Sequence, residues 1–233
     1  MQNANFKTLP LSINRLTIAL FYYYLIFTNY IPKFVYNLQI KMGYEANGLI
    51  RIEFQVLAYL IGIIPVLILL YPLLKSESKL DLKKITITIL FVISLALRMN
   101  IVFSVFITFV NGGEYLSSAN QDGLNILMEQ NIFLHHFMVI FLAPLLEEMI
   151  FRGVIFRGIR LKQNFIIAAL ISSFFFGFGH VSVSLVNGDW MNFLYLFLYA
   201  GLGFLFCGTY EYNKSIWACI LLHALYNAYT VLI

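Results

Sequence analysis

The chain has 233 residues, of which 61% are hydrophobic and only 11% are charged. A soluble domain normally carries about 25% charged residues, because its surface must meet water. The 15 basic and 11 acidic side chains are too few to cover a water-facing surface of this size. The composition therefore disfavours a soluble enzyme, a nucleic-acid-binding domain and a disordered linker, and it predicts an integral membrane protein.

Apolar runs that could cross a bilayer follow one another along the chain. A membrane-spanning helix needs about 20 apolar residues. The seven candidate runs are Leu16–Ile31, Phe54–Leu74, Ile85–Val110, Phe137–Phe156, Phe165–Val186, Phe193–Thr209 and Ile216–Ile233. The first run is short, but no small-residue cleavage site follows it, so it is interpreted as an uncleaved helix rather than a signal peptide. An eighth helix could lie between Val110 and Phe137.

These runs predict an all-α, polytopic bundle of about seven to eight transmembrane helices that forms a single integral membrane domain, residues 1–233. The role of the helices in residues 1–131 is not assigned by any motif. Residues 132–233 form a core in which a polar site is expected between helices.

The distribution of basic residues predicts the orientation of the chain, because membrane proteins keep lysine and arginine on the cytoplasmic side. With the N-terminus inside, the inside segments hold Lys7, Arg15, Lys75, Lys79, Lys83, Lys84, Arg152, Arg157, Arg160, Lys162 and Lys214. The outside segments hold only Lys33, Lys41 and Arg51. We therefore expect a multi-pass protein of the cell membrane with a cytoplasmic N-terminus and no nucleic-acid partner.

Ionisable and polar side chains stand inside three apolar runs of the C-terminal half. An ionisable group in a span costs about 2.5–3.5 kcal/mol on insertion scales, so its presence needs a reason. In chain order the runs contain Glu147, Glu148 and Arg152; then His180; and then His223 and Asn227. The simplest explanation is that three helices converge on one buried polar site.

The spacing of the first group separates its two carboxylates. Residues four apart share a helix face, whereas adjacent residues point about 100° apart. Arg152 can therefore pair with Glu148, which by itself would be an ordinary helix ion pair. Glu147 is left without a cation on its own helix. An unpaired carboxylate inside a membrane is expensive, and it is suited to take a proton from water as a general base.

The histidines add groups that such a reaction needs. His223 and Asn227 are four apart, so both can face the oxyanion of a tetrahedral intermediate. His180 comes from another helix and could orient the same water as Glu147. Taken one at a time, each histidine is more simply explained as a hydrogen-bonded packing residue.

The three groups together resemble a known family signature. Glu147-Glu148-x-x-x-Arg152, then Phe176-x-x-x-His180, then His223-x-x-x-Asn227 is similar to the motif set of the CPBP intramembrane proteases. This family is also called the Abi or CAAX amino-terminal protease family and includes the type II CAAX prenyl endopeptidase. The resemblance runs from about Phe137 to Tyr229.

The resemblance implies an intramembrane endopeptidase that hydrolyses peptide bonds of membrane-associated proteins or peptides with glutamate-activated water. It implies that Glu147 is the base and that His180 assists it, while His223 and Asn227 stabilise the oxyanion. Glu148, Arg152 and Phe176 would then support the geometry of the site. No cofactor is expected.

Three alternatives remain open from the sequence. Zinc could be held by Glu147, His180 and His223 with water in the fourth position, although no His-Glu-x-x-His helix is present. The protein could instead be a non-catalytic bacteriocin-immunity or scaffold protein of the same family. It could also be a carrier in which the buried groups relay protons.

Overall fold

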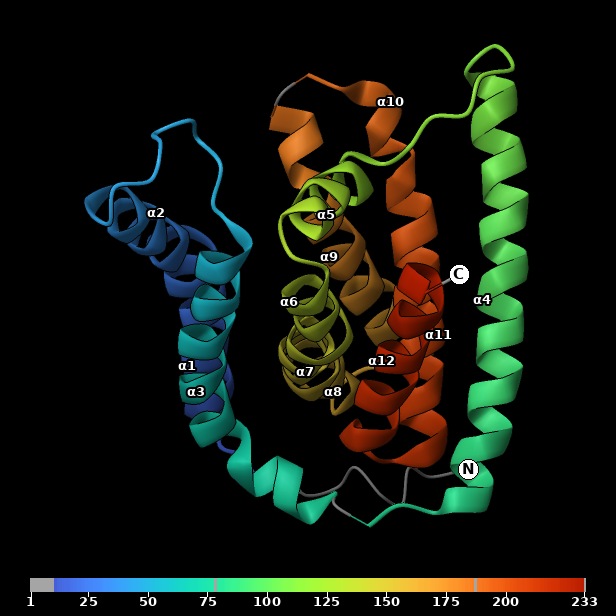
Figure 1. Cartoon of the computed structure of the whole chain (residues 1–233). Helices are drawn as coiled ribbons and strands as arrows, with labels where there is room; N and C mark the ends of the chain where they lie inside the picture. The colour runs from blue at the N-terminus through green and yellow to red at the C-terminus, as the bar shows by residue number, and fades with distance from the viewer. Residues whose placement is uncertain (1–10, 78, 187, 233) are drawn as a thin grey trace.

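The computed structural model describes residues 11–77, 79–186 and 188–232 as a bundle of helices (Figure 1). The elements are α1 (Ile13–Phe21), η1 (Tyr22–Tyr30), α2 (Ile31–Lys41), α3 (Ile52–Ser76), α4 (Leu82–Val110), α5 (Ala119–Gln130), α6 (Ile132–Phe137), η2 (Met138–Leu142), α7 (Ala143–Glu148), η3 (Met149–Phe156), α8 (Arg157–Arg160), α9 (Phe165–Val186), α10 (Trp190–Phe193), α11 (Tyr195–Asn213) and α12 (Ile216–Leu232). The η elements are π-helical. The described residues contain no strand, and the prediction of an all-α membrane bundle is confirmed.

The seven predicted runs are helical over their described residues, except that the sixth is interrupted at Leu194, a turn between α10 and α11. Ile233, the last residue of the seventh run, lies outside the described residues. The first run belongs to one helical segment, Ile13–Lys41, built from α1, η1 and α2. The fourth belongs to another, Ile132–Arg160, built from α6 to α8. The region of the suspected eighth helix forms α5, whose 12 residues rise only about 18 Å and cannot cross a bilayer core of about 30 Å.

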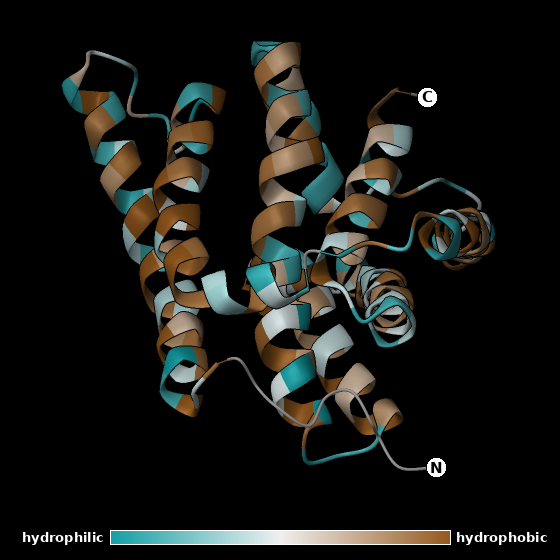
Figure 2. Ribbon diagram, turned by 90° about the horizontal axis from the view of Figure 1, so that it is seen from below, coloured by the Kyte–Doolittle hydropathy of each residue, from teal (hydrophilic) through white to brown (hydrophobic). Residues whose placement is uncertain are grey.

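Among the described residues, four helical segments are long and apolar enough to cross a membrane by length and composition, namely Ile52–Ser76, Leu82–Val110, Phe165–Val186 and Trp190–Asn213. The apolar α12 is shorter, at 17 residues. Hydrophobic residues predominate along the helices (Figure 2). Many of them face outward, as Phe109 does with 83% exposure. An apolar outer surface of this kind packs favourably against lipid and would be unfavourable in water.

The helices alternate in direction, so the connections gather at two ends of the bundle. The α3–α4, α8–α9 and α11–α12 connections lie at the lower end in Figure 1, and the α2–α3, α4–α5 and α9–α10 connections lie at the upper end. The lower connections and the residues beside them carry Lys75, Lys79, Lys83, Lys84, Arg157, Arg160, Lys162 and Lys214. The lower end therefore holds most of the predicted inside set, except that Arg152 is buried within the bundle and Lys7 lies outside the described residues. The assignment of the basic end to the cytoplasm stays a prediction.

Helices α9 and α11 approach each other closely through small residues. A Cβ added to Gly177 would lie 2.8 Å from the main-chain nitrogen of Ala200, and one added to Gly203 would lie 3.0 Å from the Cα of Ser173. Neither position has room for a side chain. This contact fixes the helix that bears His180 against the helix whose Gly203 carbonyl faces the polar site.

Glu77, at the end of α3, joins the N-terminal helices to the C-terminal core. Its carboxylate accepts hydrogen bonds from Arg157, from the Tyr210 hydroxyl at 2.9 Å and from the Ile216 main-chain nitrogen at 3.0 Å. The Ser215 hydroxyl donates to the Glu77 carbonyl at 2.8 Å. A negative side chain at the first residue of α12 also meets the positive end of that helix.

Candidate active site

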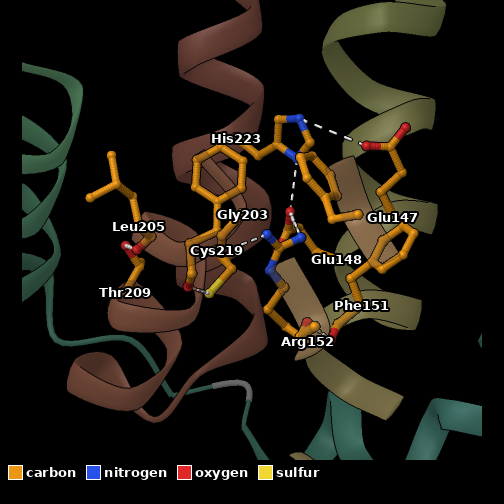
Figure 3. A network of polar contacts seen from close by, with 12 residues as sticks. Glu147, Glu148, Phe151, Arg152, Gly203, Leu205, Thr209, Cys219 and His223 are labelled. Atoms are coloured by element: carbon orange, nitrogen blue, oxygen red, sulfur yellow. Dashed lines mark hydrogen bonds and ion pairs between the residues drawn. The ribbon is translucent and has the colours of Figure 1, made fainter. Parts of the chain in front are cut away.

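A buried ion pair forms the floor of the site. Arg152 Nη1 donates to Glu148 Oε1 at 3.0 Å, and neither side chain has any exposed surface. Arg152 Nη2 donates to the Gly203 carbonyl at 2.9 Å, which ties η3 to α11. Figure 3 shows the guanidinium between these two acceptors. The pair predicted from the four-residue spacing is confirmed.

Two aromatic rings cover the guanidinium. The Cζ atom of Arg152 lies 4.6 Å from the centre of the Phe176 ring and 5.1 Å from that of Phe206. Cation–π attraction of this kind is stronger where water is excluded. Phe176 also contacts His180 at 4.7 Å between ring centres, so it supports both the ion pair and the histidine.

His223 bridges the two carboxylates (Figure 3). Its Nδ1 lies 2.8 Å from Glu148 Oε1, and its Nε2 lies 3.9 Å from Glu147 Oε2. A carboxylate accepts hydrogen bonds, so Nδ1 carries the proton and Nε2 of the neutral ring presents a lone pair toward Glu147. Glu148 thus sets the tautomer and orientation of the ring, in the way a carboxylate orients a catalytic imidazole.

Glu147 occupies a different environment from its neighbour Glu148. Its side chain is 15% exposed, whereas that of Glu148 is fully buried. Among the described residues Glu147 has no lysine or arginine within ion-pair distance, and the basic side chain that its carboxylate approaches is His223. The two carboxylates therefore differ in burial and in partners, and their separate roles in a reaction stay a prediction.

Glu147 faces a cavity of about 370 Å³ that both halves of the chain line. The motif residues on its wall are Glu147, Phe176, His180, His223 and Asn227. The N-terminal half contributes Tyr59 from α3 and Asn100 from α4, and α5 contributes Asn120 and Gln121. The N-terminal helices, which no motif assigned to a role, thus form part of the cavity wall.

His180 lies on this wall in a fixed orientation. Its Nδ1 donates to the Phe176 carbonyl at 2.9 Å, which leaves Nε2 as the acceptor of the neutral ring. The ring stacks on Tyr199 with 4.5 Å between centres and 24° between planes. The Tyr199 hydroxyl bonds to Ser118 at 2.8 Å. The structure brings His180 to the same cavity as Glu147 without a direct bond between them.

Asn227 follows His223 by one turn of α12, and both line the cavity. One amide hydrogen of Asn227 is used, since Nδ2 donates to the Val139 carbonyl at 2.8 Å and ties α12 to η2. The second amide hydrogen has no protein acceptor among the described residues. Asn227 therefore has both an anchoring contact and one donor to spare.

The donor set does not gather as a metal centre. Within residues 11–77, 79–186 and 188–232, no three side chains of His, Cys, Asp or Glu lie close enough together to hold a metal ion. Glu147 and His223 approach each other, but His180 does not complete a set with them. The cysteines, Cys207 and Cys219, are buried and free.

Sequence reasoning missed several residues of the site. Tyr199 stacks on the His180 ring, Phe206 covers the Arg152 guanidinium, and Tyr226 accepts a hydrogen bond from Asn100 at 2.6 Å. All are aromatic or amide residues within apolar runs. Because aromatics make up 17% of the chain, nothing in the sequence distinguishes these positions from ordinary packing residues.

Comparisons with known proteins cover the same residues. The family model described as type II CAAX prenyl endopeptidase Rce1-like matches residues 129–229. The membrane-embedded CAAX protease MroQ of Staphylococcus aureus is 30% identical over 171 residues, which cover 68% of this chain and 64% of MroQ. A Bacillus subtilis protein named "Putative membrane peptidase YdiL" is 38% identical over 90 residues, which cover 39% of this chain and 33% of YdiL.

A third relative, from Mycoplasma capricolum subsp. capricolum, is 33% identical over 175 residues, which cover 69% of this chain and 48% of that protein. The chain thus spans between one third and two thirds of the length of these relatives. No solved structure matches the chain.

Proposed function

Because residues 129–229, which hold all three motifs, belong to the type II CAAX prenyl endopeptidase Rce1-like family, we propose that this membrane protein is an intramembrane endopeptidase. Its substrates are membrane-associated proteins or peptides, and its nucleophile is a water molecule activated by Glu147. The observation that carries the proposal is the pairing of Glu147 with His223 at the edge of a cavity.

The distance between these two groups suits a shared water. Glu147 Oε2 and His223 Nε2 are 3.9 Å apart, too far for a direct hydrogen bond. A water about 2.8 Å from each atom fits that separation and can donate one hydrogen to each acceptor. The lone pairs of its oxygen then point away from both groups and toward a peptide carbonyl in the cavity.

The reaction balances with these residues. Glu147 takes one proton from the water as the water oxygen bonds to the carbonyl carbon. The tetrahedral intermediate collapses when the C–N bond breaks, and protonated Glu147 gives its proton to the departing amine. Glu147 returns to the carboxylate, and the products are a new carboxyl terminus and a new amino terminus.

We assign the oxyanion contact to the spare amide hydrogen of Asn227. A neutral His180 or His223 accepts at Nε2, so either ring would help the oxyanion only after protonation. Glu148 acts on the reaction through His223, whose position it determines. Arg152 and the two rings that cover it, Phe176 and Phe206, act through Glu148.

We further propose that the side chains carry out this hydrolysis without zinc. The support is that Glu147, His180 and His223 do not gather as a ligand set among the described residues. Activity in purified protein should survive 1,10-phenanthroline. Loss of activity with the chelator and recovery with added zinc would contradict the metal-free reaction.

The test of the proposed function compares protein termini in membrane fractions of cells that produce the wild type or Glu147→Gln at equal levels. Glu45→Gln, which changes an exposed carboxylate in the α2–α3 loop, is the matched control. We expect new termini with the wild type and the control and none with Glu147→Gln. Identical termini in all three, with the cell's phenotype retained, would instead favour a non-catalytic immunity or scaffold protein.

A further inference from the structure

Arg98 stands near the middle of α4, a helix long and apolar enough to cross a membrane. At 1.5 Å per residue it lies about 21 Å above Lys84 and about 20 Å below Asn111, the polar residues that bracket the apolar part of the helix. A bilayer core of about 30 Å centred on this helix leaves Arg98 about 15 Å from each boundary. Its guanidinium therefore lies at the depth of the lipid chains.

The Arg98 side chain points away from the rest of the bundle. On the inward face of α4, Val92 and Ala96 are buried, and Asn100 donates to the Tyr226 hydroxyl at 2.6 Å. Arg98 is two residues from both Ala96 and Asn100, which places it about 160° from each around the helix. It is exposed, and its side chain has no hydrogen-bond or ion-pair partner among the described residues.

An open hollow of about 420 Å³ lies beside Arg98 on this outward face. The residues that line it all belong to α4, and they are Leu90, Ile93, Ser94, Leu97, Arg98 and Ile101. Ser94 precedes Arg98 by one turn, so a small hydroxyl side chain and a guanidinium share one face with aliphatic side chains around them. Small residues on a membrane helix allow a second helix to approach closely.

An arginine in lipid without a partner is unfavourable, and charged residues inside membrane proteins are usually paired. A carboxylate matches the guanidinium best, because it accepts two parallel hydrogen bonds and cancels the charge. The carboxylate must be presented at mid-membrane depth by a partner whose backbone is satisfied within lipid. A transmembrane helix meets that requirement.

A second copy of this chain does not supply the carboxylate. Two copies share one orientation in the membrane, so a symmetric contact through this face would bring Arg98 against Arg98. Within the apolar runs the acidic residues are Glu147 and Glu148, and both face the interior of the bundle. The partner is therefore a different protein.

We propose that the outer face of α4 around Ser94 and Arg98 binds a transmembrane helix of another protein that carries an aspartate or glutamate at mid-membrane depth. The carboxylate pairs with Arg98, and apolar side chains of the partner helix fill the hollow. Asn100, on the opposite face of α4, lines the cavity that Glu147 faces, so the bound helix lies directly behind one wall of that cavity. The docking site does not depend on the proposed hydrolysis.

Synthetic transmembrane peptides test the docking site with the whole chain in phosphatidylcholine liposomes. Each peptide is a leucine–alanine helix of about 20 residues with lysines at both ends and either one glutamate or one glutamine at its centre. Energy transfer between labelled protein and labelled peptide gives the affinity. We expect the glutamate peptide to bind the wild type at least about tenfold more tightly than the glutamine peptide.

Arg98→Leu should bind the two peptides equally, and Arg98→Lys, which keeps the charge, should retain a preference for glutamate. A peptide whose glutamate lies two turns nearer one end should lose the preference, because its carboxylate is then about 11 Å from the depth of Arg98. Equal affinities of the wild type for the two centred peptides, or a preference that Arg98→Leu retains, would overturn the inference. Equal affinities together with an Arg98-dependent enrichment of phosphatidylglycerol around the protein would overturn it in favour of a lipid phosphate.

Disulfide cross-linking locates the bound peptide on the surface of the bundle. A cysteine one turn from the glutamate of the peptide should react with Ser94→Cys on α4. Phe174→Cys, which replaces an exposed side chain on α9, is the matched control. We expect at least about tenfold more cross-link at the α4 position, and we expect Arg98→Leu to abolish that difference. Equal cross-linking at the two positions would contradict a docking site on α4.

Discussion

Replacing Arg152 by methionine should destabilise the protein strongly, because the substitution leaves Glu148 charged and buried. The two side chains are fully enclosed, and the ion pair between them is 3.0 Å long. Removing one partner of a buried pair typically costs about 3–5 kcal/mol, since the remaining charge is uncompensated. The loss of the guanidinium from between Phe176 and Phe206 adds about 1–2 kcal/mol.

The assay is thermal unfolding in detergent micelles, followed with a thiol-reactive fluorophore. Cys207 and Cys219 are buried, and they are the two cysteines of the chain, so the dye reacts as the fold opens. The Glu148→Leu/Arg152→Met double variant is the control, because replacing both members of a buried pair by apolar residues is often nearly neutral. It should regain most of the lost stability and remain inactive. A single Arg152→Met variant within about 1 kcal/mol of wild type would refute the reasoning.

Two further predictions concern the packing of the helices. Gly177→Ala should destabilise the protein by about 1–3 kcal/mol, because its Cβ would meet main-chain atoms of α11. The control Gly179→Ala has open space around its Cβ and should be neutral or slightly stabilising. Equal losses of stability for the two variants in the same unfolding assay would contradict this prediction. Glu77→Ala should cost about 3 kcal/mol by leaving Arg157 without its carboxylate, and the exposed Glu45→Ala should change little. A Glu77→Ala variant as stable as Glu45→Ala would argue that α3 is held by apolar packing alone.

The pair between Glu148 and Arg152 could be predicted because it is local. Both residues lie on one helical segment, and a four-residue spacing places their side chains on one face. The same rule placed His223 and Asn227 together on α12, where both line the cavity. The helices themselves followed from apolar runs, since a chain in lipid must satisfy its backbone hydrogen bonds within each segment.

The bond between His223 and Glu148 could not be predicted, because it joins positions 75 residues apart on different helices. The sequence predicts an oxyanion contact for His223, and that role stays a prediction; the structure adds that its Nδ1 faces Glu148 and its Nε2 faces Glu147. Which of the two carboxylates binds the imidazole depends on how α12 is rotated against α7. Helical periodicity specifies a face of one helix and carries no information about the rotation of its neighbour.

The sequence by itself determined the membrane location, the helical class and which polar and ionisable side chains stand inside the apolar helices. Each of these depends on residue type and on spacing within one helix. Only the tertiary structure decided that Tyr59 and Asn100, from the N-terminal half, share a cavity with Glu147 and that no lysine or arginine of the described residues lines it. The physical reason is that a cavity is a property of surfaces from several helices, and their mutual rotation is set by packing contacts such as Gly177 against α11.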